Sequence, residues 1–160
     1  VLDFSDRGEK YAITKEDIMA YEEPLRKVDF AILNTGWEKY YGTWDFFKHP
    51  YLTEEAARAL VDLGIRIVGT DGSSADAAFG FSTAQRVENP TFEEILENMD
   101  RENVRNEAHH MLLGNETLIV EYLCNLEALP KEEAFYSFLP LKILEADGSP
   151  VRAIAMVEKS

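Results

Sequence analysis

Short apolar runs alternate with stretches of helical spacing along this chain of 160 residues. Each short run is rich in β-branched or aromatic side chains and is bounded by charges or turn formers, which is typical of strands. The runs that predict strands lie at residues 1–4, 28–33, 65–69, 118–121, 135–144 and 151–157.

Threonines mark the predicted helix starts between these runs. Thr14, Thr53 and Thr91 each precede a short stretch that contains acidic residues, which is the pattern of an N-cap, and the stretch after Thr91 has capping-box spacing. From residue 53 to residue 63 the apolar positions recur at helical spacing, and Gly64 then provides a stop. This part of the sequence therefore predicts a helix, a tight turn and a buried strand in succession.

The order of the elements predicts the fold class. Strands alternate with helices at first and become dense near the end, where residues 147–150 predict the turn of a hairpin. This order favours an α/β domain with a mixed sheet over a purely doubly wound one. A length of 160 residues is that of a single domain with a substantial core.

The net charge excludes some classes of partner, and the cysteine content indicates the cellular compartment. Sixteen basic against thirty acidic side chains give a net charge of −14, so we expect neither nucleic acid nor an anionic membrane as a partner. No apolar run approaches the roughly 18–20 residues that span a bilayer, and the first residues lack a signal-peptide pattern. The single cysteine, Cys124, fits a reducing compartment, and we expect a cytoplasmic protein. The apolar surroundings of Cys124 predict a buried thiol without a catalytic role.

Histidines are scarce, and two of the three are adjacent. His109 and His110 lie in a stretch that predicts the last turns of a helix, whereas His49 precedes a proline, as loop residues often do. A helix separates adjacent side chains by about 100°, so His109 and His110 do not easily share one pocket. Glu121 ends an apolar strand, where a buried carboxylate needs a cation or hydrogen-bond donors. Two interpretations stay open: joint metal ligation by His109 and Glu121, or a helix-terminal histidine and a glutamate in solvent.

A polar loop at residues 69–76 follows one predicted strand, a position where α/β sheets often carry functional residues. The loop offers turn-forming side chains and hydrogen-bond partners at Asp71, Ser73, Ser74 and Asp76. The alternative is an ordinary loop held by its own turn bonds. The loop does not predict phosphate binding, because no Gly-Lys-Ser/Thr ending follows its glycines.

Aromatic side chains gather directly after another predicted strand. Trp37, Tyr40, Tyr41 and Trp44 suit the wall of a pocket that receives a flat substrate. The alternative is that these rings simply cover the sheet.

These motifs, in this order, resemble the putative cyclase family of metal-dependent hydrolases, which includes the bacterial kynurenine formamidase of tryptophan catabolism. The resemblance implies an α/β fold of the kind called a swivelling β/β/α domain. It also implies a cytoplasmic homo-oligomer whose partner is a small amide. The similar segments are residues 34–37, 39–43, 49–57, 69–76, 108–121 and 139–153.

The resemblance also implies a site with one or two divalent ions, zinc or manganese. His109 and Glu121 match two of the family's ligands. The remaining ligands and the proton-transfer histidine come from a His-x-Gly-Thr-His-x-Asp-x-Pro-x-His motif that these residues do not contain. We therefore expect residues 1–160 to form a single cyclase-like hydrolase domain that lacks its N-terminal metal-binding segment, and to be inactive or metal-poor without it.

The activity that the resemblance implies is attack of metal-activated water on a small amide, such as an arylformamide or a cyclic amide like isatin. The expected substrate contacts are Trp37, Tyr40, Tyr41, Trp44, Asp71 and Ser74. Residues 76–104 would form a lid or an oligomer contact. The main alternative is a non-catalytic ligand-binding or assembly domain without the metals. A weaker alternative is that His109 serves as a metal-free general base, which predicts activity insensitive to chelators.

Overall fold

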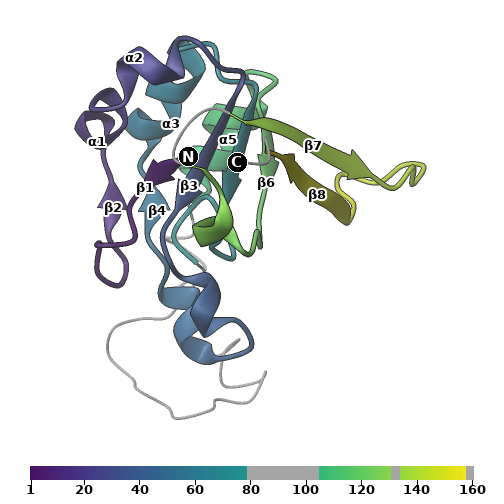
Figure 1. Ribbon diagram of the computed structural model, residues 1–160, viewed down its shortest axis with the longest axis horizontal. Helices are drawn as coiled ribbons and strands as arrows, with labels where there is room; N and C mark the ends of the chain where they lie inside the picture. The colour runs from purple at the N-terminus through teal and green to yellow at the C-terminus, as the bar shows by residue number, and fades with distance from the viewer. Residues whose placement is uncertain (79–104, 131–133, 158–160) are drawn as a thin grey trace.

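A four-stranded parallel sheet forms the centre of the molecule (Figure 1). The computed structural model describes residues 1–78, 105–130 and 134–157. In the sheet, Leu2 faces Leu33, and Val68 lies between Ala31 and Ile119. The strands, in their order across the sheet, are β1 (Leu2–Asp3), β3 (Phe30–Asn34), β5 (Ile67–Thr70) and β6 (Leu118–Val120).

Shorter elements surround this sheet. The α-helices of the described residues are α1 (Lys15–Met19), α2 (Glu22–Leu25), α3 (Glu54–Asp62) and α5 (Glu107–Leu113). The 3₁₀ turns are η1 (Glu38–Tyr40), η2 (Trp44–Lys48) and η3 (Leu126–Ala128). Two further strand pairs are parallel β2 (Ala12–Ile13) with β4 (Tyr51–Leu52), and antiparallel β7 (Phe135–Pro140) with β8 (Val151–Met156).

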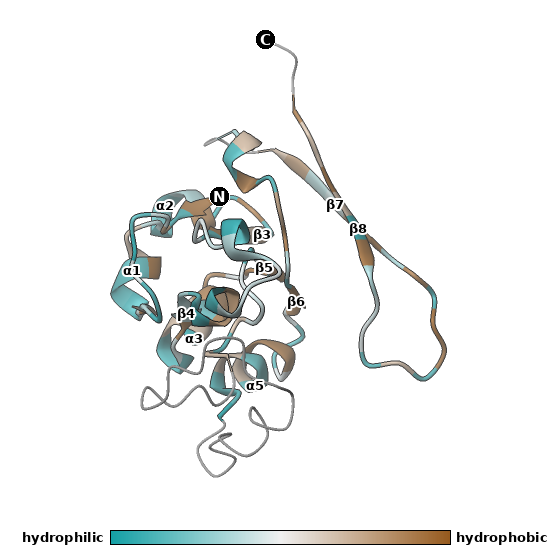
Figure 2. Cartoon of the chain, turned by 90° about the horizontal axis from the view of Figure 1, so that it is seen from below, coloured by the Kyte–Doolittle hydropathy of each residue, from teal (hydrophilic) through white to brown (hydrophobic). Residues whose placement is uncertain are grey.

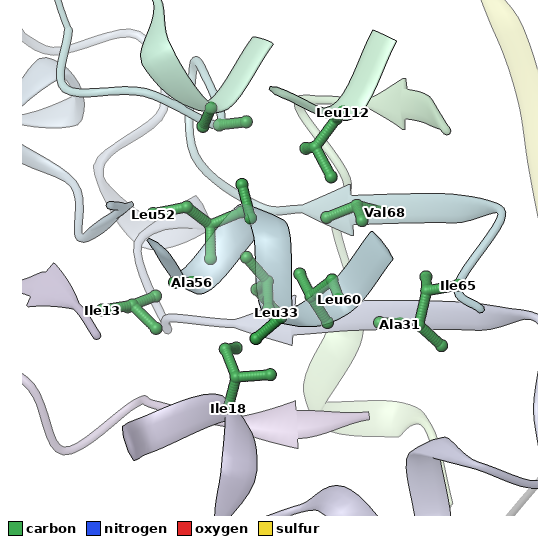
Figure 3. Packing of buried hydrophobic residues seen from close by; sticks show 14 of the residues in the cluster. Ile13, Ile18, Ala31, Leu33, Leu52, Ala56, Leu60, Ile65, Val68 and Leu112 are labelled. Atoms are coloured by element: carbon green, nitrogen blue, oxygen red, sulfur yellow. The ribbon is translucent and has the colours of Figure 1, made fainter. Parts of the chain in front are cut away.

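Helices cover one face of the parallel sheet. Successive strand residues point to opposite faces, so Leu33 and Val68 meet the helices on the same side. Figure 3 shows Leu60 of α3 beside Leu33, with Ile18 of α1 nearby, and all three are buried. The apolar positions of α3 recur at helical spacing, and this stripe packs onto the sheet.

A smaller apolar cluster covers the opposite face. Ile32 and Val120 pack there with Leu123 and Leu126, which follow β6. The root of the β7–β8 hairpin adds two partly buried aromatic rings, Tyr136 and Phe138. On this face a Cβ atom at residue 69 would lie 2.7 Å from a methyl group of Leu123, so the close packing requires glycine in the middle of β5.

Local signals set the helix ends that the structure describes. Thr14 and Asp17 form a reciprocal capping box at α1, and the Thr53 side chain accepts a hydrogen bond from the backbone of Ala56 at α3. Gly64 has a φ of +86° directly after α3. The predicted starts at Thr14 and Thr53 and the stop at Gly64 are confirmed. Thr91 and the expected lid at residues 76–104 lie almost wholly outside the described residues.

The predicted α/β fold with both parallel and antiparallel strands is confirmed, although the two kinds of pairing occur in separate sheets. The predicted strand at 135–144 ends earlier, at Pro140, which faces Val151 in the last pair of the hairpin. Beyond this pair, Pro150 accepts a hydrogen bond from the Leu141 N–H but has no N–H to return, so the ladder stops. The connection is a long loop rather than a tight turn at 147–150.

The prediction that Cys124 is buried was wrong, because its thiol is exposed. β6 ends at Val120, and the inward positions in the next segment are taken by Leu123 and Leu126. Burial beyond the end of a strand depends on how the chain bends, which an apolar composition does not specify.

The β7–β8 hairpin projects from the body of the molecule on the side away from α1 (Figures 1 and 2). Alternate residues on one of its faces are large, apolar and exposed: Phe135 (64%), Leu139 (62%), Ile154 (44%) and Met156 (55%). A solvent-facing sheet surface is usually polar, so this apolar face is unusual.

No helix in residues 1–78, 105–130 and 134–157 is long and apolar enough to cross a membrane.

Truncating Leu60 tests the assignment of the main core. Leu60 is fully buried between α3 and the sheet. We expect Leu60→Ala to lower the free energy of unfolding by about 2–5 kcal/mol, because it removes buried methyl groups and leaves a cavity. Leu113→Ala, at a half-exposed position of α5, should change it by less than about 0.5 kcal/mol. Urea denaturation measures both, and equal effects would contradict the packing.

Candidate functional site

Loops that follow β3, β5 and β6 meet at the carboxyl edge of the parallel sheet, where open α/β sheets commonly bind ligands. The loop after β5, residues 71–76, contacts both neighbours. Its Asp71 carboxylate accepts hydrogen bonds from Thr35 after β3, and the backbone N–H of Ala75 donates to Glu121 after β6.

Asp71 holds the turn after β3. Its carboxylate is fully buried and accepts from the Thr35 backbone (2.9 Å), the Thr35 hydroxyl (2.7 Å) and the Trp37 backbone (2.7 Å). A buried carboxylate satisfied in this way is stable without a counter-ion. In the structure these hydrogen bonds hold the turn after β3, and the contact of Asp71 with substrate stays a prediction. Ser74, half-buried, accepts a hydrogen bond from the Asp76 backbone within the same loop.

The expected aromatic wall divides into packing and exposed rings. Trp37 is buried, and its indole N–H donates to the Asp45 carbonyl at 2.8 Å. Tyr40 packs against Trp37, with ring centroids 4.9 Å apart. Trp44 is half-buried and packs against Phe47. These three rings mainly build the loop.

Tyr41 is the expected substrate contact that lies most open, at 71% exposure. Its ring meets Tyr122 edge-on with centroids 6.2 Å apart, and Phe46 packs beneath both. Tyr122 follows Glu121 directly and has a φ of +59°, a left-handed conformation that is uncommon for a bulky residue. Sequence reasoning missed Tyr122, and its only signal was the position after Glu121.

His49 lies beneath the loop after β5. It is 1% exposed, and its Nδ1 donates to the Pro50 carbonyl at 2.8 Å, because a carbonyl can only accept. Gly72 packs so closely that a Cβ there would lie 2.8 Å from the imidazole. His49 Nε2 has no hydrogen-bond partner within the described part of the chain. Burial lowers the pKa of His49 and outweighs the opposing effects of the Pro50 carbonyl and Asp71.

Asp76 joins the loop to α5. Its carboxylate is 3% exposed and accepts from the backbone N–H groups of Ala108 (2.7 Å) and His109 (3.0 Å). These are unpaired donors of the first helical turn, so Asp76 caps α5 from a distant part of the chain. The helix begins at Glu107, which places His109 in its first turn rather than in the last turns as predicted.

The side chains of His109 and Glu121 face each other. His109 Nδ1 lies 2.6 Å from Asp76 Oδ2, and His109 Nε2 lies 3.4 Å from Glu121 Oε1. Both side chains are partly open, at 29% and 27% exposure. The hydrogen bond to Asp76 raises the pKa of His109, the negative charges of Glu121 and Asp76 add to the effect, and burial opposes it.

His110 points elsewhere, as the helical geometry predicts. It is exposed and lines a shallow hollow with Glu54, Glu107, Met111 and Asn115. Only His109 of the adjacent pair lies at the carboxyl edge of the sheet.

Comparison with known proteins identifies the N-terminal part of the chain. Residues 1–77 match the family described as putative cyclase. The resemblance inferred from the motifs is thereby confirmed. The matched segment ends at residue 77, just after the loop that contains Asp71 and Asp76.

Longer similarities cover the rest of the chain. An uncharacterised protein of Methanocaldococcus jannaschii is 28% identical over 156 residues, which are 94% of this chain and 65% of that protein. Isatin hydrolase A from Labrenzia aggregata superposes with a TM-score of 0.74 at 26% identity, over 99% of this chain and 59% of that one. A protein described as a predicted metal-dependent hydrolase from Bacillus stearothermophilus shares the fold, with a TM-score of 0.62 at 22% identity over 96% of this chain and 60% of that one.

The chain therefore has the fold of the cyclase-family hydrolases and spans about three fifths of the length of these relatives. His109 and Glu121 lie beyond the segment matched by the family but within the longer similarities.

The donor set of His109 and Glu121 fits part of a metal site. Imidazole nitrogen and carboxylate oxygen both suit zinc, and ligating histidines usually donate their other N–H to a carboxylate, as His109 does to Asp76. Two ligands about 2.1 Å from a tetrahedral zinc ion lie about 3.4 Å apart. Nε2 and Oε1 are separated by 3.4 Å. In residues 1–78, 105–130 and 134–157, however, no three His, Cys, Asp or Glu side chains converge to hold an ion.

Replacing His49 tests the burial of a neutral imidazole. The pKa of His49 is lowered in the folded protein. At a pH below the ordinary histidine pKa of 6.5, the unfolded chain therefore binds a proton at His49 that the folded chain does not bind. Stability is therefore lost as the pH falls through this range. His49→Asn keeps a donor for Pro50 and removes the titration, so we expect a shallower decline in the free energy of unfolding between pH 7 and pH 5. Urea denaturation at several pH values measures it, and identical slopes in both proteins would refute the assignment.

Proposed function

We propose that this chain is the larger part of a metal-dependent hydrolase of small amides, and that His109 and Glu121 are two of its metal ligands. The observation that carries the proposal is the 3.4 Å separation of His109 Nε2 and Glu121 Oε1, with Nδ1 held by Asp76. The similarity to isatin hydrolase A supports the reaction class.

Two residues of this chain would hold the ion. His109 supplies a neutral nitrogen from the first turn of α5, and Glu121 supplies a negative oxygen from the end of β6. The Ala75 N–H holds Glu121 Oε1 at 3.0 Å, which limits the rotation of the carboxylate. A zinc or manganese ion bound here would lower the pKa of a water molecule towards neutrality and polarise an amide carbonyl.

Two ligands from this chain are fewer than the three that catalytic zinc sites generally use. We propose that the remaining ligands, and the group that transfers the proton to the leaving amine, come from outside the described residues. The lengths of the relatives, which exceed this chain by a large fraction, agree with this division.

Tyr41 and Tyr122 form the surface on which we propose that the substrate rests. Both rings are exposed, at 71% and 51%, and Tyr122 is the direct neighbour of Glu121. Phe46 supports them from below, with its centroid 5.3 Å from that of Tyr122. Such a surface favours an amide that carries an aryl ring, because ring–ring contacts add to the area buried.

Replacing the glutamate ligand tests the metal assignment. In the natural protein, Glu121→Gln should lower bound zinc or manganese well below the wild-type stoichiometry and reduce amide hydrolysis in parallel, because the amide lacks the negative charge of the carboxylate. Elemental analysis after purification without chelator gives the metal content. Glu127→Gln, on the exposed turn η3, is the control and should retain the metal. Unchanged metal in Glu121→Gln would end the ligand assignment, whereas a wild-type protein without metal would favour a non-catalytic domain.

Removing the exposed ring tests the substrate surface. We expect Tyr41→Ala to raise KM for an aryl amide roughly tenfold, the loss of about 1.4 kcal/mol of binding. KM for an amide with only an alkyl group should stay nearly constant, and metal content should not change. Steady-state kinetics with the two substrates decide the point. A proportional loss on both substrates would show that Tyr41 acts on the loop rather than on the ring.

A further inference from the structure

We infer that Asp76 is the positioning residue of the site: it fixes the imidazole of His109 so that Nε2, and not Nδ1, faces Glu121 and the ion. The inference rests on the proposed function. It assigns a task to a buried carboxylate that at first sight only caps a helix.

Hydrogen-bond chemistry sets which nitrogen is free. The Asp76 carboxylate already accepts two backbone N–H groups, and an ionised carboxylate can only accept. His109 Nδ1, at 2.6 Å from Oδ2, must therefore carry the ring hydrogen. In the neutral ring Nε2 then has its lone pair available, and this atom lies towards Glu121. Asp76 thus selects the tautomer in which Nε2 carries no hydrogen, which binding of a metal ion at Nε2 requires.

Burial makes this selection rigid. Asp76 is 3% exposed, and its two oxygens are tied to successive N–H groups of the first turn of α5. The imidazole is held by the same oxygen that holds the backbone of its own residue. Rotation of the ring away from Glu121 would break the 2.6 Å bond, so the direction of Nε2 is coupled to the start of the helix.

One short stretch of loop positions both proposed ligands. Asp76 holds His109, and the preceding residue, Ala75, donates its N–H to Glu121. Ala75 is buried and its carbonyl also accepts from the backbone of Leu52, so the stretch is anchored on both sides. The same stretch of loop therefore fixes the positions of the two proposed ligands relative to each other, although they lie on different elements.

Another residue of the chain provides a control for the role of Asp76 as a helix cap. Asp17 is also a capping carboxylate: it accepts from the Thr14 backbone at 2.9 Å in the capping box of α1. Asp17 touches neither His109 nor Glu121 in the contacts of the described residues. Asp17→Asn therefore shows what the loss of a capping carboxylate away from the site does to stability and zinc binding.

The expected effect of Asp76→Asn follows from its geometry. Both oxygens of Asp76 accept backbone N–H groups, so the amide must place its NH₂ against one of them. If the NH₂ replaces Oδ2, it donates to His109 Nδ1 and drives the ring hydrogen to Nε2, which removes the lone pair that faces Glu121. If the NH₂ replaces Oδ1, the hydrogen bond to Nδ1 survives but loses its charge assistance.

The test measures the His109 tautomer and the affinity for zinc ion in the natural protein. At a pH above the raised pKa of His109, where the ring is neutral, ring ¹⁵N shifts of the metal-free wild type should show hydrogen on Nδ1, and Asp76→Asn should show a population with hydrogen on Nε2. Zinc affinity, measured against a chelator of known affinity, should fall about 10–100-fold in Asp76→Asn. It should stay within about twofold of wild type in Asp17→Asn. Asp76→Asn should have no further effect when His109 is already alanine, because Asp76 acts through the ring.

The outcomes separate this inference from the proposed function. A wild-type ring with hydrogen on Nε2, or wild-type zinc affinity in Asp76→Asn, overturns the positioning role while the metal site stands. An equal loss of affinity in Asp76→Asn and Asp17→Asn, or a loss in Asp76→Asn that persists when His109 is already alanine, shows that Asp76 acts only as a helix cap. If His109→Ala and Glu121→Gln bind zinc as tightly as wild type, the proposed metal site itself fails.

Discussion

Two carboxylates buried in one loop organise the carboxyl edge of the sheet. Asp71 and Asp76 are almost inaccessible to solvent, and a charge in such a place is costly unless donors surround it. Each finds its donors in a neighbouring segment: Asp71 in the turn after β3, and Asp76 in the first turn of α5. The hydrogen bonds that these two carboxylates require fix the loops relative to one another. The candidate site lies on the loops that are held in this way.

The same edge holds two histidines in opposite electrostatic environments. His49 is packed under Gly72, and burial lowers its pKa, so it remains a neutral part of the framework. His109 is partly open and bonded to a carboxylate, which raises its pKa. A nitrogen held by a carboxylate on one side and facing a second carboxylate on the other is suited to a cation, whereas a nitrogen enclosed by apolar packing is not.

Local patterns predicted much of the fold, and non-local contacts explain most of what they missed. Thr14, Thr53 and Gly64 act on residues within one turn, so the sequence alone locates these helix ends. The family motif supplied His109 and Glu121, and the structure brings them together. The roles of Asp71 and Asp76 depend on segments more than thirty residues away, and no short pattern encodes which carboxylate will meet which backbone.

Strand β6 carries a consequence for the durability of the site. It is three residues long, lies at the edge of the sheet and pairs with β5 from a distant part of the sequence. Edge strands open more readily than a core, and pairings between remote segments form late. Fraying of β6 would carry Glu121 away while the helices remain packed on the other strands. The lifetime of the proposed site under heat is then set by the fraying of one edge, and an ion held between His109 and Glu121, as proposed, would keep that edge in place.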